Sequence, residues 1–127
     1  MARTAMWILG GTLALAAGCT HAPRPSGAKQ DEGLASYYAS ALAGRPTASG
    51  EPYDHGRLTC AHRRFAFGTR LKVTNLHNGR SVVVVVNDRG PFVRGRVVDV
   101  SLAAARELGM VEAGVVPVRV EPLGGAP

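Results

Sequence analysis

The sequence has few cysteines and few aromatic side chains. Among 127 residues it has two cysteines, Cys19 and Cys60, and Phe, Trp and Tyr together make up 6%. Two cysteines do not form a disulfide framework, so a disulfide-stapled fold is excluded. The basic residues are not interleaved with aromatic ones and show no helix-turn-helix pattern, so the sequence indicates no nucleic-acid partner.

Residues at metal-ligand spacing are also missing. His21, His55 and His77 have no such spacing with cysteines or acids, so we predict no metal site and no cofactor. The apolar stretch at residues 6–17 is too short to span a bilayer comfortably, and it is typical of a signal peptide instead.

The composition fits one small domain that is rich in turns. Hydrophobic residues make up 46%, which is enough for a core, and 16 glycines with 8 prolines favour short strands joined by turns. Fifteen Lys and Arg against nine Asp and Glu give a net charge of +6. This charge suits an anionic envelope polymer or membrane surface. We expect a monomer.

Residues 1–18 are interpreted as a lipoprotein signal peptide, because the apolar stretch ends in Ala-Gly-Cys19. This ending resembles a bacterial lipobox, in which the peptide is cut before the cysteine and the thiol is lipidated. The resemblance implies a lipid anchor at Cys19, in the outer membrane and facing the periplasm. The alternative is an ordinary secretory signal with an incidental cysteine. Residues 19–32 show no apolar periodicity and are predicted to be a flexible tether.

The predicted domain covers residues 33–123, with a short tail at 124–127. Hydrophobic alternation and β-branched runs predict strands at 33–38, 68–75, 82–86, 96–100 and 115–120. Residues 59–62 are predicted to form one helical turn. Many short strands in so short a domain indicate a mainly β fold, a small closed barrel.

Turn and cap residues support these elements. The Asn-Gly pair at 78–79 predicts a hairpin between the second and third predicted strands. Pro117 indicates an edge or a bulge in the last strand. Ser101 is a good N-cap for a short helix at 102–108, which Gly109 would close.

The run from Val82 to Val86 is the most apolar strand, and five β-branched residues in a row predict burial on both faces. The turn cluster at 87–91 ends it, so Asp88 would lie at the rim of the core. Partial burial there would raise the pKa of Asp88 toward the range of a general acid. The alternative is that Asp88 only caps the turn. The long loop at 39–58 is expected to be functional.

Several blocks of the domain closely resemble the rare lipoprotein A (RlpA) family in order and spacing; they lie at 33–38, 44–54, 58–62, 67–75, 78–80, 86–92 and 95–101. The resemblance implies a six-stranded double-psi β-barrel with one or two short helices, a fold shared with plant expansins. It also implies endolytic lytic transglycosylation of peptidoglycan glycan strands poor in stem peptides. That reaction cleaves the MurNAc–GlcNAc β-1,4 bond and leaves a 1,6-anhydro-MurNAc end. Many family members carry a C-terminal SPOR domain, and we expect none in this sequence.

The resemblance assigns catalysis to Asp88, Glu51, Asp54 and His62. Glycosidic cleavage needs an acid that protonates the leaving oxygen and groups that stabilise an oxocarbenium-like centre. We choose Asp88 as the residue that gives this proton and later accepts one from the sugar 6-OH. Glu51 and Asp54 would raise its pKa by like-charge repulsion, while a cationic His62 would lower it. Alternatively, His62 is a core histidine bonded to backbone, and Glu51 and Asp54 are solvated loop charges.

Arg89, Asp99 and Tyr53 are the predicted substrate-binding residues. Arg89 would contact sugar or pair with a carboxylate. Asp99 would form a wall of the site or assist the N-cap of the helix. Tyr53 would stack on a sugar together with Tyr37 and Tyr38, for which core packing is the alternative. Cys60 is interpreted as a small buried hydrophobe.

The sequence is compatible with two other functions. The barrel could bind peptidoglycan and loosen it without cleavage, as an expansin-like module, or it could be a structural lipoprotein that docks onto a partner. Release of anhydro-muropeptides from sacculi would distinguish cleavage from binding.

Overall fold

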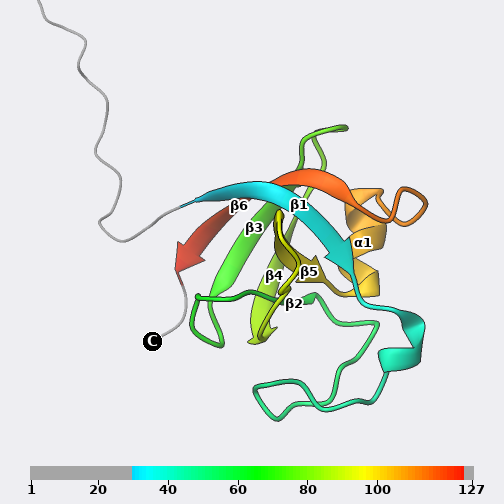
Figure 1. Cartoon of the computed structure of the whole chain (residues 1–127), viewed down its shortest axis with the longest axis vertical. Helices are drawn as coiled ribbons and strands as arrows, with labels where there is room; N and C mark the ends of the chain where they lie inside the picture. Colours follow the sequence, from blue (N-terminus) through cyan, green and yellow to red (C-terminus); the bar gives the residue numbers. More distant parts are fainter. Residues whose placement is uncertain (1–29, 125–127) are drawn as a thin grey trace, which may run out of the picture.

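Six strands close into a barrel in the computed structural model, which describes residues 30–124 (Figure 1). The strands are β1 (Asp31–Tyr37), β2 (Thr59–Ala61), β3 (Arg70–Asn75), β4 (Ser81–Asp88), β5 (Arg96–Val100) and β6 (Val116–Gly124). A 3-10 turn, η2 (Ser40–Leu42), and one helix, α1 (Leu102–Leu108), complete the fold. The predicted six-stranded barrel with one or two short helices is therefore confirmed.

Strands that are neighbours in the barrel are mostly not neighbours in sequence. The order around the barrel is β1-β5-β2-β4-β3-β6, with β1 parallel to β5 and β2 parallel to β4. The short strand β2 lies between β4 and β5 and pairs with both. Because β2 is short, its Ala61 pairs both with Asp88 at the end of β4 and with Asp99 near the end of β5. The loop between β1 and β2 also reaches this part of the barrel, where Ser49 N–H donates to the Asn87 carbonyl.

The core is filled by one face of each strand. On β4, Val82, Val84 and Val86 are buried, whereas Val83 is 38% exposed and Val85 is half-buried. The prediction that this run is buried on both faces was wrong. A closed barrel fully covers only its inner face, so the outward side chains stay in contact with solvent.

Residues 59–61 form a strand, so the predicted helical turn was wrong. The segment is too short to show a period of its own, and its pairing with β4 and β5 decides its conformation. Cys60 is fully buried in the core, as predicted, and burial raises the pKa of its thiol. Pro117 is the second residue of β6, and pairing with β3 begins only at Val118. Its missing N–H therefore falls at a strand end and not at an edge or bulge.

The predicted caps and hairpin are confirmed. The Ser101 side chain accepts a hydrogen bond from the backbone N–H of Ala104, and Gly109 closes α1 in the left-handed conformation at φ 66°. β3 and β4 form an antiparallel hairpin with Gly79 at φ 78°. These features depend on neighbouring residues alone, which explains why the sequence predicts them well.

The barrel begins earlier than the predicted domain. β1 starts at Asp31, so the last two residues of the predicted tether belong to the barrel. Cys19, the signal peptide and most of the tether lie outside the described residues. Within residues 30–124, no helix is both long and apolar enough to cross a membrane.

Candidate active site

Asp88, the last residue of β4, has both carboxylate oxygens held by donors. Its Oδ1 accepts hydrogen bonds from the backbone N–H groups of Ala48, at 2.8 Å, and Arg89, at 2.9 Å. Its Oδ2 accepts one from the hydroxyl of Tyr38, at 2.5 Å. A carboxylate offers about four lone-pair positions, two on each oxygen. Oδ1 is therefore fully used, and the remaining position lies on Oδ2.

The loop at 39–58 supplies one of these donors because it lies against the end of β4. Ala48 bonds the Asp88 side chain, and the backbone N–H of the next residue, Ser49, donates to the carbonyl of Asn87 at 3.2 Å. The loop therefore contributes backbone groups as well as acids to this end of the barrel. The loop is therefore held in place at the site, and its expected functional role stays a prediction.

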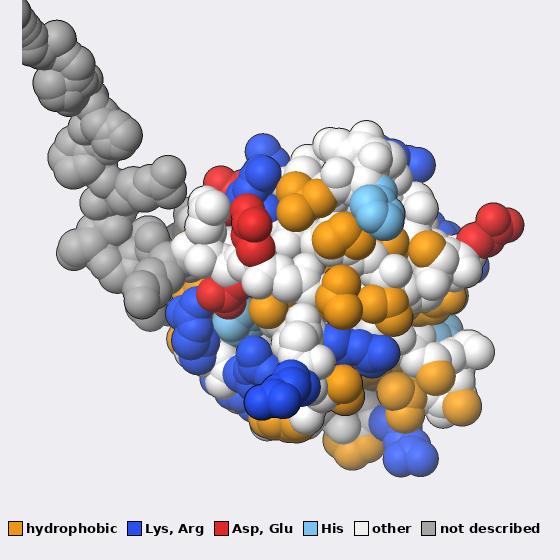
Figure 2. Space-filling model, turned by 45° about the horizontal axis from the view of Figure 1, so that its top comes forward, with side chains coloured by type: hydrophobic (Ala, Val, Ile, Leu, Met, Phe, Trp, Pro, Cys, Tyr) orange, Lys and Arg blue, Asp and Glu red, His pale blue; other side chains and the backbone are white. Residues whose placement is uncertain are grey.

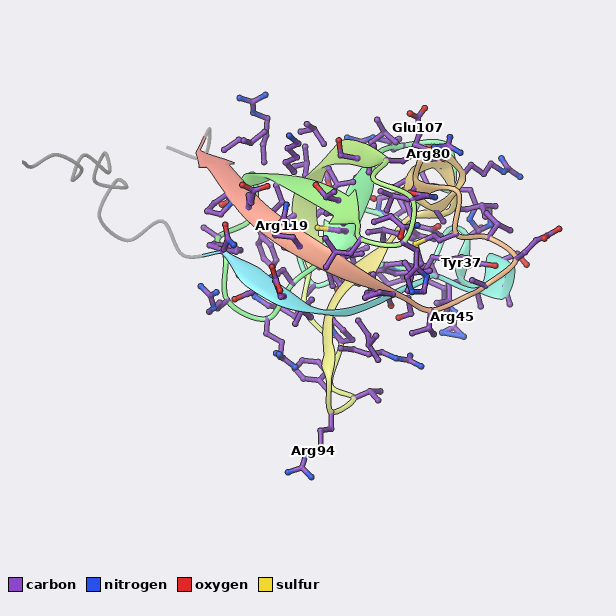
Figure 3. All side chains as sticks on the ribbon, turned by 90° about the horizontal axis from the view of Figure 1, so that it is seen from above. Tyr37, Arg45, Arg80, Arg94, Glu107 and Arg119 are labelled. Carbon is purple, nitrogen blue, oxygen red and sulfur yellow. The ribbon has the colours of Figure 1, made fainter. Side chains whose placement is uncertain are left out.

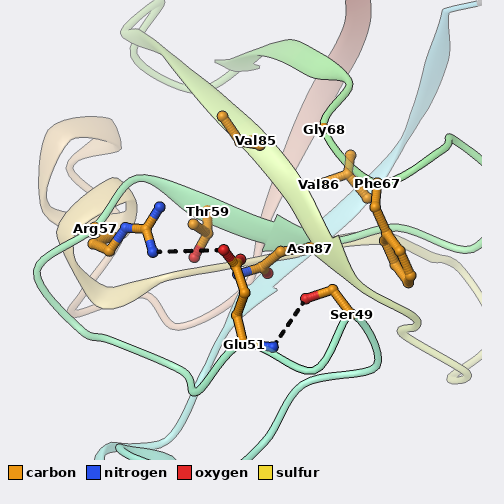
Figure 4. A pocket seen from close by; sticks show the side chains of 9 residues that line it. All are labelled: Ser49, Glu51, Arg57, Thr59, Phe67, Gly68, Val85, Val86 and Asn87. Atoms are coloured by element: carbon orange, nitrogen blue, oxygen red, sulfur yellow. Dashed lines mark hydrogen bonds and ion pairs between the residues drawn. The ribbon is translucent and has the colours of Figure 1, made fainter. Parts of the chain in front are cut away.

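A pocket adjoins the end of β4 on the side of Asn87 (Figure 4). It has a volume of about 390 Å³ and is lined by Ser49, Glu51, Arg57, Thr59, Phe67, Gly68, Val85, Val86 and Asn87. Figure 4 shows Arg57 and Phe67 at opposite sides, with Glu51 and Asn87 between them. The pocket therefore combines charged and polar groups with an aromatic wall, as small-molecule sites commonly do.

Glu51 enters this pocket and is only loosely held. Its Oε1 accepts a hydrogen bond from Asn87 Nδ2 at 3.2 Å, and its Oε2 lies 4.0 Å from Arg57 Nη1. Both side chains of the ion pair are about half exposed, at 49% and 56%, so the pair is weak. Glu51 and Asp88 thus come to adjacent parts of the site through neighbouring residues of β4.

Asp99 on β5 lies across β2 from Asp88. Ala61 of β2 pairs with Asp88 on one side and with Asp99 on the other. Burial raises the pKa of Asp99; the hydrogen bond from Ser36 Oγ, at 3.2 Å, and nearby Arg96 oppose this, while Asp88 adds to it. The Asp99 side chain is bonded to Ser36 and does not assist the helix cap, while its role as a site wall stays a prediction.

His62 does not reach the site, contrary to the prediction. Only 2% of it is exposed, and both ring nitrogens have partners: Nε2 lies 3.0 Å from Asp31 Oδ2, and Nδ1 accepts from the backbone N–H groups of Arg64 and Phe65. Burial lowers its pKa, although Asp31 opposes this. The alternative of a core histidine is the one that the structure supports. Its backbone still touches the site, because His62 N–H donates to the Asp88 carbonyl at 3.2 Å.

Asp54 is also not brought toward Asp88 by any contact among the described residues. It is exposed, and its Oδ1 accepts a hydrogen bond from the backbone N–H of Gly56 at 2.8 Å. Asp54 therefore stabilises its own turn, which is a common use of aspartate. Of the two loop acids, Glu51 is the one that lines the pocket.

Arg89 and Tyr53 have structural partners that the sequence did not reveal. Arg89 Nη1 donates to the carbonyls of His62 and Phe65, at 3.2 and 2.9 Å, and its guanidinium lies 4.1 Å from the ring centre of Phe67. Arg89 thus supports a wall of the pocket, and in the described part of the chain it forms no ion pair with a carboxylate. Tyr53 is 3% exposed, so its predicted role as a sugar platform was wrong.

Sequence reasoning missed several residues of the site. Asn87 and Phe67 line the pocket, Ala48 donates through its backbone, and Tyr38 donates through its hydroxyl. All four residues stand in the blocks that carry the family resemblance. Tyr38 was expected to stack on a sugar or to pack in the core, and its bond to Asp88 was not expected. Within residues 30–124, no three His, Cys, Asp or Glu side chains form a group that could hold a metal ion.

Comparisons with known proteins identify the family of the barrel. The family model described as lytic transglycolase matches residues 30–120. A probable endolytic peptidoglycan transglycosylase RlpA of Nostoc is 59% identical over 95 residues, which are 73% of this chain and 26% of the relative. The Campylobacter jejuni endolytic peptidoglycan transglycosylase RlpA is 47% identical over 73% of this chain and 34% of its own length. The chain thus matches about a quarter to a third of these relatives.

Solved structures share the barrel. The apo expansin of Clavibacter michiganensis superposes with a TM-score of 0.60 and 25% identity, over 78% of this chain and 52% of the expansin. The Streptomyces papain inhibitor gives a TM-score of 0.59 and 25% identity, over 73% and 93% of the two chains. With the family model covering most of its barrel, the chain belongs to the lytic transglycolase family, the double-psi β-barrel family of the RlpA proteins.

Proposed function

We propose that this barrel is an endolytic lytic transglycosylase that cleaves peptidoglycan glycan strands in the bacterial cell envelope. The observation that carries the proposal is Asp88: its Oδ2 keeps one open lone-pair position, and the adjoining pocket presents Glu51. The relatives from Nostoc and Campylobacter jejuni are named for the same activity. Strands poor in stem peptides are the proposed substrate.

The reaction uses one carboxyl group twice. Protonated Asp88 gives its proton to the oxygen of the MurNAc–GlcNAc β-1,4 bond while that bond breaks, and an oxocarbenium-like centre develops at C1 of MurNAc. The 6-OH of the same MurNAc then attacks C1, and its proton returns to Asp88. Water is not consumed, and the products are a 1,6-anhydro-MurNAc end and a GlcNAc end. Glu51 and Asp99 are proposed to contact the sugars on either side of Asp88.

The surface around Asp88 suits an anionic glycan. The loop after Asp88 exposes Phe92, at 79%, and Val93, at 52%, and Figure 3 shows Arg94 at its tip, pointing away from the barrel. On the face seen in Figure 2, Lys and Arg side chains lie at several places, most of them in the lower half of the view, with hydrophobic side chains also exposed there. Aromatic rings stack on sugars and basic groups attract anionic polymers, so both features support glycan binding.

A sacculus digest tests the activity. Purified protein is incubated with sacculi and with glycan strands from which an amidase has removed the stem peptides, and the soluble products are analysed for anhydro-muropeptides. We expect release by the wild type, more from the stripped strands, and a loss of roughly 10²- to 10⁴-fold in Asp88→Asn. Asp88→Asn should still sediment with sacculi, because its amide keeps the shape of the carboxylate. Absence of anhydro ends from wild-type digests on both substrates would overturn the proposal.

A second candidate is a barrel that binds glycan without cleaving it. The observation that favours it is the likeness to expansin, one solved structure of which is a complex of a mutant Clavibacter michiganensis expansin with cellohexaose, at a TM-score of 0.58 and 25% identity over 78% of this chain and 54% of that one. Sedimentation with sacculi and no anhydro product would support this function.

We also propose that a lipid at Cys19 anchors the protein to the outer membrane. The Cys19→Ser variant should then be released into the periplasm.

A further inference from the structure

Two stacked tyrosines lie between Asp88 and the start of α1. Tyr38 follows β1 and Tyr53 belongs to the loop at 39–58; they are 8% and 3% exposed. Their ring centres are 4.3 Å apart and the rings are nearly parallel, at 15°. The Tyr38 hydroxyl donates to Asp88 Oδ2, and the Tyr53 hydroxyl accepts from the backbone N–H of Leu102 at 3.0 Å.

His55 completes this arrangement, and its hydrogen bonds define its tautomer. Its Nε2 lies 3.2 Å from the carbonyl oxygen of Ser40, and its Nδ1 lies 3.0 Å from the Tyr53 hydroxyl. A carbonyl only accepts, so Nε2 must carry the proton and Nδ1 of the neutral ring is an acceptor. Tyr53 therefore donates its proton to His55 and accepts the Leu102 N–H with the same oxygen. Every polar group of the set has a partner in this one state.

We propose that Tyr38 is the positioning residue for Asp88, and that Tyr53 and His55 hold Tyr38 in place. This inference rests on the proposed function of Asp88. The two backbone N–H groups both bind Oδ1 and so fix one point of the carboxylate. The Tyr38 hydroxyl fixes the second oxygen and therefore sets the plane of the carboxylate and the direction of its open position.

The surroundings of Tyr38 keep it a donor. Its pKa is raised mainly by burial, then by the hydrogen bond to Asp88 and by the charges of Asp88 and Asp99. The hydroxyl thus stays protonated at any pH at which the enzyme would work. Among the described residues, Tyr38 is the one side chain that donates to Asp88. Its loss would leave Oδ2 without a protein partner.

Tyr38→Phe tests the proposal because it removes one oxygen atom and keeps the stacked ring. We expect kcat to fall roughly 10- to 100-fold, with KM changed less than about twofold, since a lost hydrogen bond to a charged group is worth a factor of that size. The descending limb of the pH profile should move to higher pH, because the carboxylate loses a donor that favours its charged form. Tyr53→Phe also keeps the stacked ring. It should lower kcat and move the descending limb to higher pH, but by smaller amounts than Tyr38→Phe.

Tyr37→Phe is the matched control. It removes the same atom from the neighbouring residue, whose hydroxyl donates to the Val111 carbonyl at 2.8 Å, away from Asp88. A loss of rate that Tyr37→Phe reproduces, or that comes with no movement of the pH limb, would mean that the Tyr38 hydroxyl only stabilises the fold. Either result would overturn the proposal.

A measurement without substrate separates this inference from the proposed activity. The carboxyl carbon of Asp88 is followed by NMR during a pH titration of the wild type, Tyr38→Phe and Tyr37→Phe. The expected result is a higher midpoint in Tyr38→Phe alone, even if the wild type cleaves no glycan. Equal midpoints in all three proteins would overturn the inference whatever the activity assay gives.

Discussion

Asp31 Oδ2 lies 3.0 Å from His62 Nε2, so the first residue of β1 is tied to the residue that follows β2. The other oxygen of Asp31 accepts a hydrogen bond from Arg64 Nη2 at 2.6 Å. Because His62 Nδ1 accepts two backbone N–H groups, Nε2 carries the ring proton and donates it to Asp31. The buried ring is therefore neutral and fully bonded, and Asp31 is its partner.

This contact predicts where the chain can be shortened. A fragment that begins at residue 30 should melt at the same temperature as the full chain. A fragment that begins at Gly33 should fold but melt on the order of 10 °C lower, because it loses both bonds of Asp31 and two pairs of the β1–β6 ladder. Thermal unfolding followed by circular dichroism measures both. Equal melting temperatures for the two fragments would contradict the structural role of Asp31.

The buried His62 also predicts a loss of stability in acid. Its pKa in the folded state is lowered, so the unfolded chain takes up a proton more readily. The protein should therefore lose stability as the pH falls below about 6.5, the ordinary value for histidine, and the loss should end at the lower pKa of the folded state. His62→Gln should be less stable at pH 7 but should lose the part of the pH dependence that comes from this ring. His77→Gln, at an exposed hairpin position, serves as the control and should keep the wild-type dependence.

The sequence predicts best what neighbouring residues decide. The Asn-Gly hairpin, the Ser101 cap and the end of α1 at Gly109 all depend on local conformation, and all three are confirmed. The many short strands predicted a closed barrel and placed Asp88 at its rim, and the family resemblance added the double-psi topology and the other site residues. No local pattern distinguished β2 from a helical turn, because its pairing partners lie far away in sequence.

The candidate site was less predictable because its geometry depends on distant contacts. His62 belongs to a block of the family, yet its ring is bonded to Asp31, which precedes the predicted domain. The role of Ala48 lies in a backbone N–H, which no side-chain pattern reveals. Tyr38 and Tyr53 look alike in sequence, and their rings stack on each other in the structure. Only their hydrogen bonds distinguish them, because Tyr38 bonds Asp88 and Tyr53 bonds the start of α1.

The two acids of the long loop should differ in their effect on activity. Glu51→Gln should lower the release of anhydro-muropeptides roughly 10- to 100-fold, because Glu51 lines the pocket and a charged contact to substrate is worth a factor of that size. Asp54→Asn should change it less than about twofold, since Asp54 is exposed and its amide can still accept from Gly56. Initial rates on stripped glycan strands give both numbers. A larger loss in Asp54→Asn than in Glu51→Gln would reverse the assignment.

Asp99→Asn should make the barrel more stable and less active. Burial raises the pKa of Asp99, so keeping it charged costs the folded state stability once the pH exceeds about 3.9, the value in an unfolded chain. At pH 7 the variant should therefore melt a few degrees higher, roughly, while Ser36 can still donate to the amide oxygen. Near pH 3 the difference should disappear, because both states then hold a protonated carboxyl.

The loss of activity in Asp99→Asn follows from its place across Ala61 from Asp88, where it would contact the sugar on the other side of the cleaved bond. Gain of stability together with loss of rate is the pattern of a residue retained for function at the expense of the fold. Asp54→Asn is the matched control, the same chemical change at an exposed position, and should alter neither quantity. A lower melting temperature for Asp99→Asn at pH 7 would show that the charge, through Ser36 and Arg96, supports the barrel instead.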